Sequence, residues 1–411
     1  MSFFRKYLFV IPLFNFLIAA LYGLLLRTMV VRHMPFNFKN LTHAHSHVAI
    51  LGWVYMILFL LLTQYFVGEF GKSFKRLFWL TQIAVIGMII GFPIQGYGGI
   101  SIAASSLYII FSYVFSTVMF KKTKQKKSAA YTMMRSALIW LCLSTVSLWA
   151  LGPFIGSMGS SSKPALLSIQ YFLHFQLNGW FLFAIVALFF NFLKIPDTKD
   201  FRIFHSTFAV SLVLTFFLPV NWYYDFAIFR LLNGLGVIFQ LISLYYGFKL
   251  VRQYGGEFIS KQDRLSKTLL LFAAVSFVLK VLFQSFSLIP DIAKHIFDNR
   301  QAVIGFIHLM MLGIISAYLF YNLRIQQQDK TARRLMSVGI WFFLAGIALT
   351  EFILLYQGLS YYFPSITMSS YAYFLWIFSF LLLVGIYMIM ISAFDLEFKE
   401  KPVAEESQIE R

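Results

Sequence analysis

Residues 41 to 56 read LTHAHSHVAILGWVYM, a stretch that joins a polar, histidine-rich segment to a long apolar run. His43, His45 and His47 occupy alternate positions, so three of the eight histidines in the chain fall within five residues. The apolar run continues to residue 66, and about twenty apolar residues are enough to cross the hydrocarbon core as an α-helix. The stretch therefore predicts a transmembrane helix that carries imidazoles at one end.

The rest of the chain shares this apolar character. Of its 411 residues, 60% are hydrophobic and 12% are charged, whereas a soluble protein carries about a quarter charged residues. The single cysteine, Cys142, lies in an apolar run, so no intramolecular disulfide can form. The sequence contains no nucleotide-binding loop and no pair of catalytic carboxylates, which argues against ATP-driven transport and against hydrolysis.

Twelve apolar windows of about twenty residues predict twelve transmembrane helices. The predicted spans are residues 7–27, 46–66, 77–97, 101–120, 136–157, 165–193, 204–220, 226–248, 268–289, 301–323, 335–356 and 371–394. Because the polar connections are short, we predict an all-α polytopic protein with a single twelve-helix bundle over residues 1–395. A short polar tail follows at residues 396–411. No internal repeat is evident from the sequence.

The distribution of Lys and Arg predicts the orientation of the bundle. With the N-terminus inside, the inner segments hold 26 of the 34 basic residues and the outer segments hold 6. Such a bias is the positive-inside pattern of membrane proteins, and it predicts that both termini are cytoplasmic. It also explains the net charge of +18, because basic loops suit the anionic cytoplasmic leaflet. We therefore expect the lipid bilayer, and no nucleic acid, as a partner.

Five histidines fall in the outer half of the predicted membrane, on three spans that run in the same direction. His43, His45 and His47 open the second span, whereas His174 and His308 lie nine and seven residues into the sixth and tenth. At 1.5 Å per residue, the last two lie roughly 10–14 Å below the outer surface. Residues four apart share a helix face, so His43 and His47 point one way and His45 the other. Neutral imidazole binds haem iron, copper and zinc, which predicts a cofactor.

Other polar side chains accompany these histidines inside the spans. Gln170 and Asn178 flank His174 at four-residue steps, and Lys280 and Glu351 fall within the ninth and eleventh spans. Ionisable residues in the membrane are costly, so a functional role is the first expectation for them. The alternative is that each forms only a hydrogen bond between helices or reaches a polar crevice, and that alternative stays open here.

These features together resemble subunit I of the haem–copper oxidases, which has twelve spans and histidines on spans two, six and ten. The segments HAHSHVAILGW (43–53), HFQLNGWF (174–181) and HLMMLGIIS (308–316) are most similar to divergent members of that superfamily. Those members include the catalytic subunits of cbb-type oxidases and nitric-oxide reductases and the NnrS-like membrane proteins. The resemblance covers the whole chain in topology but only these short segments in motif.

The resemblance implies a set of cofactor ligands. It places a haem ligand on the second span, where His47 is the deepest histidine, and another at the position of His308. Arg230, near the outer end of the eighth span, would pair with the haem propionates. The implied haem-binding residues are therefore His43, His47, His308 and Arg230. The implied copper ligand is His174, and His45 is either a surface group or a metal ligand at a second site.

Two departures from the family limit what the resemblance implies. The seventh span lacks the pair of histidines that completes the copper site, and Asn178 stands where many oxidases have a tyrosine. The implied function is a haem-binding membrane protein, with copper as a second cofactor candidate. It would carry out oxygen or nitric-oxide redox chemistry or electron transfer in the bacterial inner membrane. An electron-donor subunit or quinol would supply the electrons. The competing prediction is a secondary transporter or metal permease that uses the intramembrane His, Lys and Glu residues.

Overall fold

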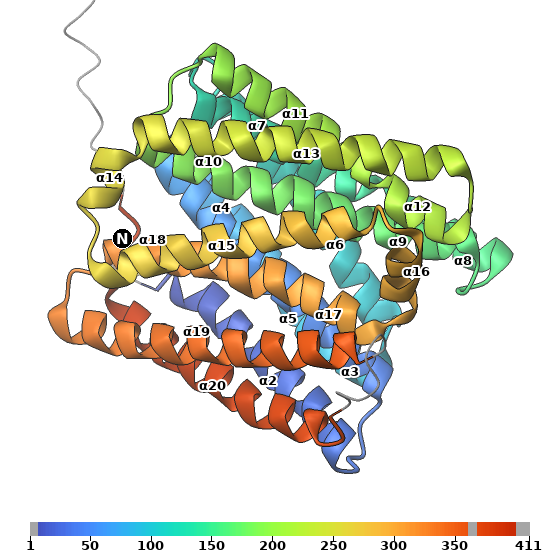
Figure 1. Ribbon diagram of the computed structural model, residues 1–411. Helices are drawn as coiled ribbons and strands as arrows, with labels where there is room; N and C mark the ends of the chain where they lie inside the picture. The colour runs from blue at the N-terminus through green and yellow to red at the C-terminus, as the bar shows by residue number, and fades with distance from the viewer. Residues whose placement is uncertain (1–6, 361–367, 400–411) are drawn as a thin grey trace, which may run out of the picture. The chain divides into compact units, whose positions relative to one another are not determined.

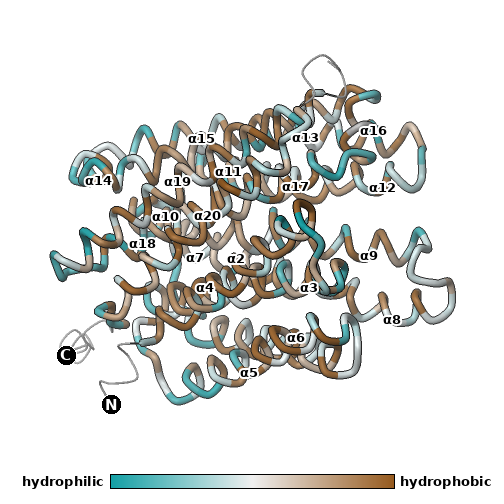
Figure 2. The backbone as a smooth tube through the Cα atoms, turned by 90° about the horizontal axis from the view of Figure 1, so that it is seen from below, coloured by the Kyte–Doolittle hydropathy of each residue, from teal (hydrophilic) through white to brown (hydrophobic). Residues whose placement is uncertain are grey.

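The computed structural model describes residues 7–360 and 368–399. Within these ranges the chain forms helices and no strand, and twelve helices are long and apolar enough to cross a membrane (Figure 1). The prediction of an all-α protein with twelve spans is confirmed. Figure 2 shows apolar residues along much of the long helices, with polar residues more frequent at helix ends and turns. The chain is thus an integral membrane protein whose partner is the lipid bilayer.

The first six spans, in chain order, are built from the following helices, where η marks a π-helical or 3-10 segment. They are α2 (Val10–Val31); α3 (Phe38–His47), η1 (Val48–Tyr55), α4 (Met56–Leu62) and η2 (Thr63–Val67); α5 (Lys72–Gln95); α6 (Gly99–Lys122); α7 (Ala129–Ser144) and α8 (Val146–Met158); and α9 (Lys163–His174), η3 (Phe175–Phe181) and α10 (Leu182–Leu193).

The last six spans follow the same order. They are α11 (Lys199–Thr215) and α12 (Phe217–Tyr223); α13 (Ala227–Tyr254); α15 (Arg264–Phe286); α17 (Arg300–His308), η4 (Leu309–Ser316) and α18 (Ala317–Gln326); α19 (Lys330–Leu359); and α20 (Tyr371–Ser392) with η6 (Ala393–Asp395). Two short helices, α14 (Gly256–Ser260) and α16 (Pro290–Asp298), lie in connections. Most of the predicted tail, from residue 400 on, lies outside the described residues.

The chain divides into two compact units. Unit 1 comprises Met1–Lys126, Leu323–Phe343 and Leu382–Arg411, and unit 2 comprises Lys127–Asn322 and Leu344–Leu381. Unit 1 contains the histidine triplet of the second span. Unit 2 contains His174 and His308. The prediction of a single bundle over residues 1–395 stays a prediction.

Three spans are more deeply buried than the others. The apolar windows of the second, sixth and tenth spans are 89%, 67% and 67% buried, and no other described span exceeds 50%. A helix that is apolar on every side is buried among other helices, and every residue of α4 is fully buried. These three interior spans are the ones on which the sequence places His47, His174 and His308.

The second span begins earlier than its predicted start at residue 46. Its first helix, α3, starts at Phe38, because the Asn37 side chain accepts a hydrogen bond from the Asn40 backbone N–H at 3.0 Å and caps the helix. The apolar window missed this start, since the first turns are polar. As a result, His43 and His47 lie within the transmembrane helix and not at its first turn.

In unit 1, α19 and α20 approach each other at a pair of glycines. A Cβ built at Gly339 would lie 2.8 Å from the Gly385 carbonyl oxygen, and one at Gly385 would lie 2.7 Å from the Phe343 backbone nitrogen. Small residues let transmembrane helices pack with their backbones close together. At Gly358, farther along α19, a Cβ would meet no neighbouring atom within 4 Å.

We therefore expect Gly339→Ala to destabilise the protein by about 1–3 kcal/mol, because the added methyl group has no room. Thermal unfolding in detergent would show a lowered midpoint. The matched control is Gly358→Ala on the same helix, which should leave the midpoint unchanged or raise it slightly, since Ala favours helix. Equal midpoints for the two variants would contradict the close contact.

Candidate functional site

The histidine triplet divides between two faces of α3. The rings of His43 and His47 lie on one face with their centroids 6.4 Å apart. His45 lies on the other face, against α2, where its Nδ1 is 2.8 Å from the Ala19 carbonyl oxygen. The predicted arrangement of the three side chains is confirmed. His45 is a packed residue of the α2–α3 contact, because a Cβ at Gly23 would lie 2.9 Å from its ring.

The backbone determines which nitrogen of His47 carries the proton. The Nδ1 of His47 lies 2.8 Å from the His43 carbonyl oxygen, and a carbonyl can only accept a hydrogen bond. Nδ1 is therefore the donor, and in the neutral ring Nε2 carries the lone pair. The hydroxyl of Tyr97 lies 3.4 Å from Nε2, which is long for a hydrogen bond.

On the same face of α3, His43 offers a second ring nitrogen beside Nε2 of His47. Its Nε2 is buried and has no hydrogen-bond partner among the described residues. The ring lies 4.7 Å from that of Tyr97, and the His47 ring lies 4.2 Å from that of Phe92. Buried polar atoms are nearly always satisfied, so an unpaired imidazole nitrogen indicates a partner such as a water, an ion or a cofactor. His43, His47, Phe92 and Tyr97 are called the α3 imidazole face below.

In unit 2, His174 is held by the neighbouring span. Its Nε2 lies 2.8 Å from the Leu212 carbonyl oxygen in α11, so Nε2 is the donor and Nδ1 carries the lone pair of the neutral ring. Asn178 donates from Nδ2 to the His174 carbonyl oxygen at 3.2 Å. The Asn178 Oδ1 is buried without a hydrogen-bond partner in the described part of the chain. Gln170, one turn earlier, forms a hydrogen bond with Tyr223.

The predicted intramembrane charges in unit 2 differ in their surroundings. His308 Nδ1 and Glu351 Oε1 lie 3.9 Å apart, an ion pair when the imidazole is protonated. Lys280 is only 2% exposed and lies close enough to act electrostatically on His174. His308 therefore lies beside an acidic group and His174 lies near a basic one, so their electrostatic environments are opposite. Arg230 forms an ion pair with Asp225 in the connection before α13.

A pattern that the sequence analysis missed links the three interior spans. His47, His174 and His308 are each followed, at the fifth residue, by a glycine, and a π-helical segment begins directly after each histidine. The three histidines stand nine, eleven and eight residues after the first residue of their spans. They therefore lie at a similar height along the helix, about 12–17 Å from its start. The signal was present in the sequence as a repeated His-x4-Gly spacing.

The glycine of each pattern is a point of close helix contact. A Cβ at Gly52 would lie 3.0 Å from Val85, one at Gly179 would lie 2.9 Å from the Trp140 Cβ, and one at Gly313 would lie 2.7 Å from Ser276. Each glycine thus packs against a neighbouring span in its own unit. π-Helical segments are rare and occur often at functional sites, and here each one connects a histidine to a packing contact.

The predicted copper site is not assembled from side chains that the structure describes. Within residues 7–360 and 368–399, no group of three His, Cys, Asp or Glu side chains is placed to hold a metal ion. In unit 1 the ring centroids of His43 and His47 lie 6.4 Å apart, and in unit 2 His308 Nδ1 lies 3.9 Å from Glu351 Oε1. Copper binding by His174 and metal binding by His45 stay predictions.

No protein-family model matches the chain, and no curated protein is significantly similar to it in sequence. The class of the protein is that of a twelve-span, all-α integral membrane protein with histidines on its three interior spans.

We expect Gly179→Val to lower the thermal midpoint in detergent, because the isopropyl group would displace Trp140 and separate η3 from α7. The free energy of unfolding should fall by about 1–3 kcal/mol. The control is Gly156→Val in α8, where no atom lies within 4 Å of a Cβ and the substitution adds the same groups. A Gly179 variant as stable as the Gly156 variant would show that the η3 glycine is not a packing contact.

Proposed function

We propose that this protein binds haem and that the α3 imidazole face supplies a ligand to the iron. The observation that carries the proposal is the buried His43 Nε2, which has no hydrogen-bond partner among the described residues. It lies beside His47, a second imidazole whose lone pair is on Nε2. Neutral imidazole is a common axial ligand of haem iron. Of the two, His47 is the proposed ligand, and His43 is the second candidate on the same face.

The surroundings of His47 suit a metal ligand. A ligating histidine usually donates its other N–H to a carbonyl or a carboxylate, which orients the ring and selects the tautomer. The His43 carbonyl provides that acceptor for Nδ1. Phe92 and Tyr97 provide aromatic surface next to both rings, which suits the flat, apolar face of a porphyrin. The residues present therefore fit a haem.

Bound haem would supply one-electron redox chemistry and a site for oxygen or nitric oxide. The residues of the chain would hold the His47 ring in one tautomer and place a hydroxyl, that of Tyr97, beside the ligand. On the resemblance to the oxidases, His308 and His174 are proposed as further ligands, the second of them for copper. Arg230 is proposed as a partner of the propionates.

The proposal includes an orientation and an electron source. The excess of Lys and Arg in alternate connections supports cytoplasmic termini. The proposed location is the bacterial inner membrane. The chain has one cysteine, so it lacks the C-x-x-C-H motif of an attached c-type haem. Electrons would then come from a separate donor subunit or from quinol.

The test is a dithionite-reduced minus oxidised visible spectrum of the full-length protein, purified in detergent after expression with added haem. The wild type should show Soret and α bands. In His47→Ala the haem per protein should fall by at least about tenfold, since loss of even an outer partner of a metal ligand has effects of this size. His43→Ala and His308→Ala, measured in parallel, assign the other candidates.

The control is His33→Ala, which removes an exposed imidazole just before α3 and should leave the spectrum unchanged. Thermal midpoints of all variants show whether each one folds. A featureless spectrum for the folded wild type would overturn the haem proposal. Full retention of the bands in both His47→Ala and His43→Ala would remove the α3 imidazole face from it.

A second candidate function, metal transport, is favoured by one specific observation. His43 and His47 are four residues apart with their rings on one face, the spacing with which a helix presents two imidazoles to a metal ion. His308 and Glu351 form a second pair that a cation could use. Under this alternative the purified protein would contain no haem, and proteoliposomes would take up Zn²⁺ or Cu⁺ at a rate that His43→Ala abolishes.

A further inference from the structure

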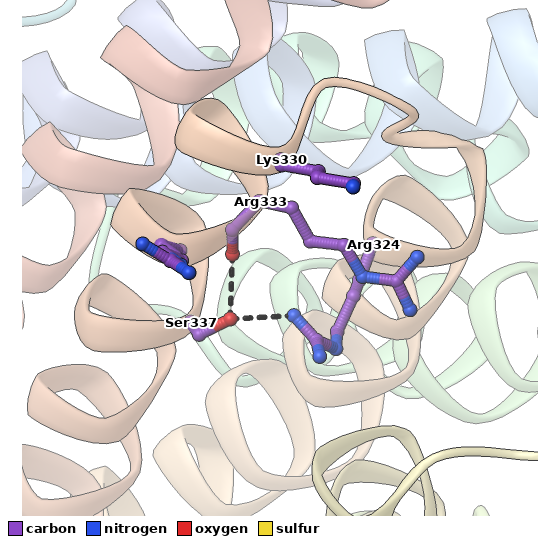
Figure 3. A pocket seen from close by; sticks show the side chains of 5 residues that line it. Arg324, Lys330, Arg333 and Ser337 are labelled. Carbon is purple, nitrogen blue, oxygen red and sulfur yellow. Dashed lines mark hydrogen bonds between the residues drawn. The ribbon is translucent and has the colours of Figure 1, made fainter.

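The turn between the tenth and eleventh spans contains a basic pocket. α18 ends at Gln326 and α19 begins at Lys330. The pocket has a volume of about 320 Å³ and lies wholly within unit 1. Its lining residues are Arg324, Lys330, Arg333, Arg334 and Ser337 (Figure 3). Four of the five are cationic, and no carboxylate belongs to this lining as far as the chain is described.

The arginine at the base of this pocket is buried and oriented. Arg324 is only 7% exposed, and its Nη1 donates to the Ser337 hydroxyl at 2.6 Å. The hydroxyl in turn donates to the Arg333 carbonyl oxygen at 2.5 Å. Figure 3 shows both bonds, with the Arg333 and Lys330 side chains extending toward the same side as Arg324. The guanidinium is thus held in place before any ligand arrives.

The turn that carries these cations is also held in place. Gln64 at the end of the second span donates to Gln326 at 2.8 Å, and Gln327 donates to the Ser392 carbonyl oxygen at 2.6 Å. The Asp329 carboxylate accepts from a backbone N–H in the first turn of α19 at 2.7 Å. The Asp329 side chain thus caps α19. The pocket is therefore built on rigid elements, as a specific binding site requires.

The electrostatics of the pocket favour an anion. Four of the five lining side chains are cationic, and opposite charges attract, so the lining suits an anionic ligand. The positive-inside rule explains why basic residues occur in such a connection. It does not explain why Arg324 is turned inward and buried beside Ser337. Arginine binds phosphate oxygens through two parallel N–H donors, with a geometry that lysine lacks.

We propose that this pocket is a binding site for a phosphate-bearing anion, with Arg324 and Arg333 as the principal ligands. Lys330 and Arg334 would add positive charge at its rim. A volume of about 320 Å³ accommodates a phosphate ester of the size of glycerol phosphate. This chemistry occurs in the headgroup of an anionic phospholipid and in a soluble phosphate ester. The site does not depend on the haem proposal.

The test uses the full-length protein, delipidated in a neutral detergent. One arm adds phosphatidylglycerol or, for comparison, phosphatidylcholine, and measures bound lipid by native mass spectrometry together with the thermal midpoint. The other arm adds inorganic phosphate or glycerol phosphate at constant ionic strength and measures the midpoint. The test variant is Lys330→Gln with Arg334→Gln, since both side chains are exposed and their loss should not prevent folding. Ser337→Ala tests the orientation of Arg324.

The matched control is Lys126→Gln with Lys127→Gln, which removes the same charge from exposed positions outside the pocket. In the expected result, wild type and control bind a phosphate probe equally, and the pocket variant binds it about tenfold or more weakly. Selective retention of phosphatidylglycerol assigns the lipid source, and a response to glycerol phosphate alone assigns the soluble one. Equal responses of the pocket variant and the control to every probe would overturn the proposal.

Discussion

The hydrocarbon core of a bilayer offers no hydrogen-bond partner, so every polar group inside it has to be satisfied by the chain itself. This constraint explains the helical architecture and also its local exceptions. The Gly52 carbonyl lies in η1, and the fully buried Asn15 donates to it from α2 at 2.9 Å. Asn15 is in turn paired with Gln82 of α5. A polar link of this kind joins three spans of unit 1 where the helix geometry changes.

The same constraint gives the intramembrane histidines their chemistry. His45, His47 and His174 each use one ring nitrogen on a backbone carbonyl, which leaves the lone pair of the neutral ring on the other nitrogen. A side chain that is first oriented by packing can then serve as a ligand at little further cost in conformational freedom. The His43 Nε2, buried without a hydrogen-bond partner among the described residues, is the exception, and for that reason it carries the functional proposal.

The two proposed sites differ in their charge. The α3 imidazole face offers neutral nitrogens with aromatic rings around them, which suits a cofactor that is largely apolar. The pocket at the start of α19 collects four cations around a hydrogen-bonded serine, which suits an anion. The imidazole face lies within the second span, and the cationic pocket lies at the turn between the tenth and eleventh spans.

Features that depend on neighbouring residues could be predicted from the amino-acid order alone. Twelve spans follow from the length and apolarity of each segment, and the opposite faces of His47 and His45 follow from the period of the helix. The remaining features required the folded chain, because they depend on contacts between distant segments. The nitrogen that remains available on His174 depends on Leu212 in another span. The orientation of the Arg324 guanidinium likewise depends on Ser337 in the next helix, so a basic loop residue and a site residue look the same in the sequence.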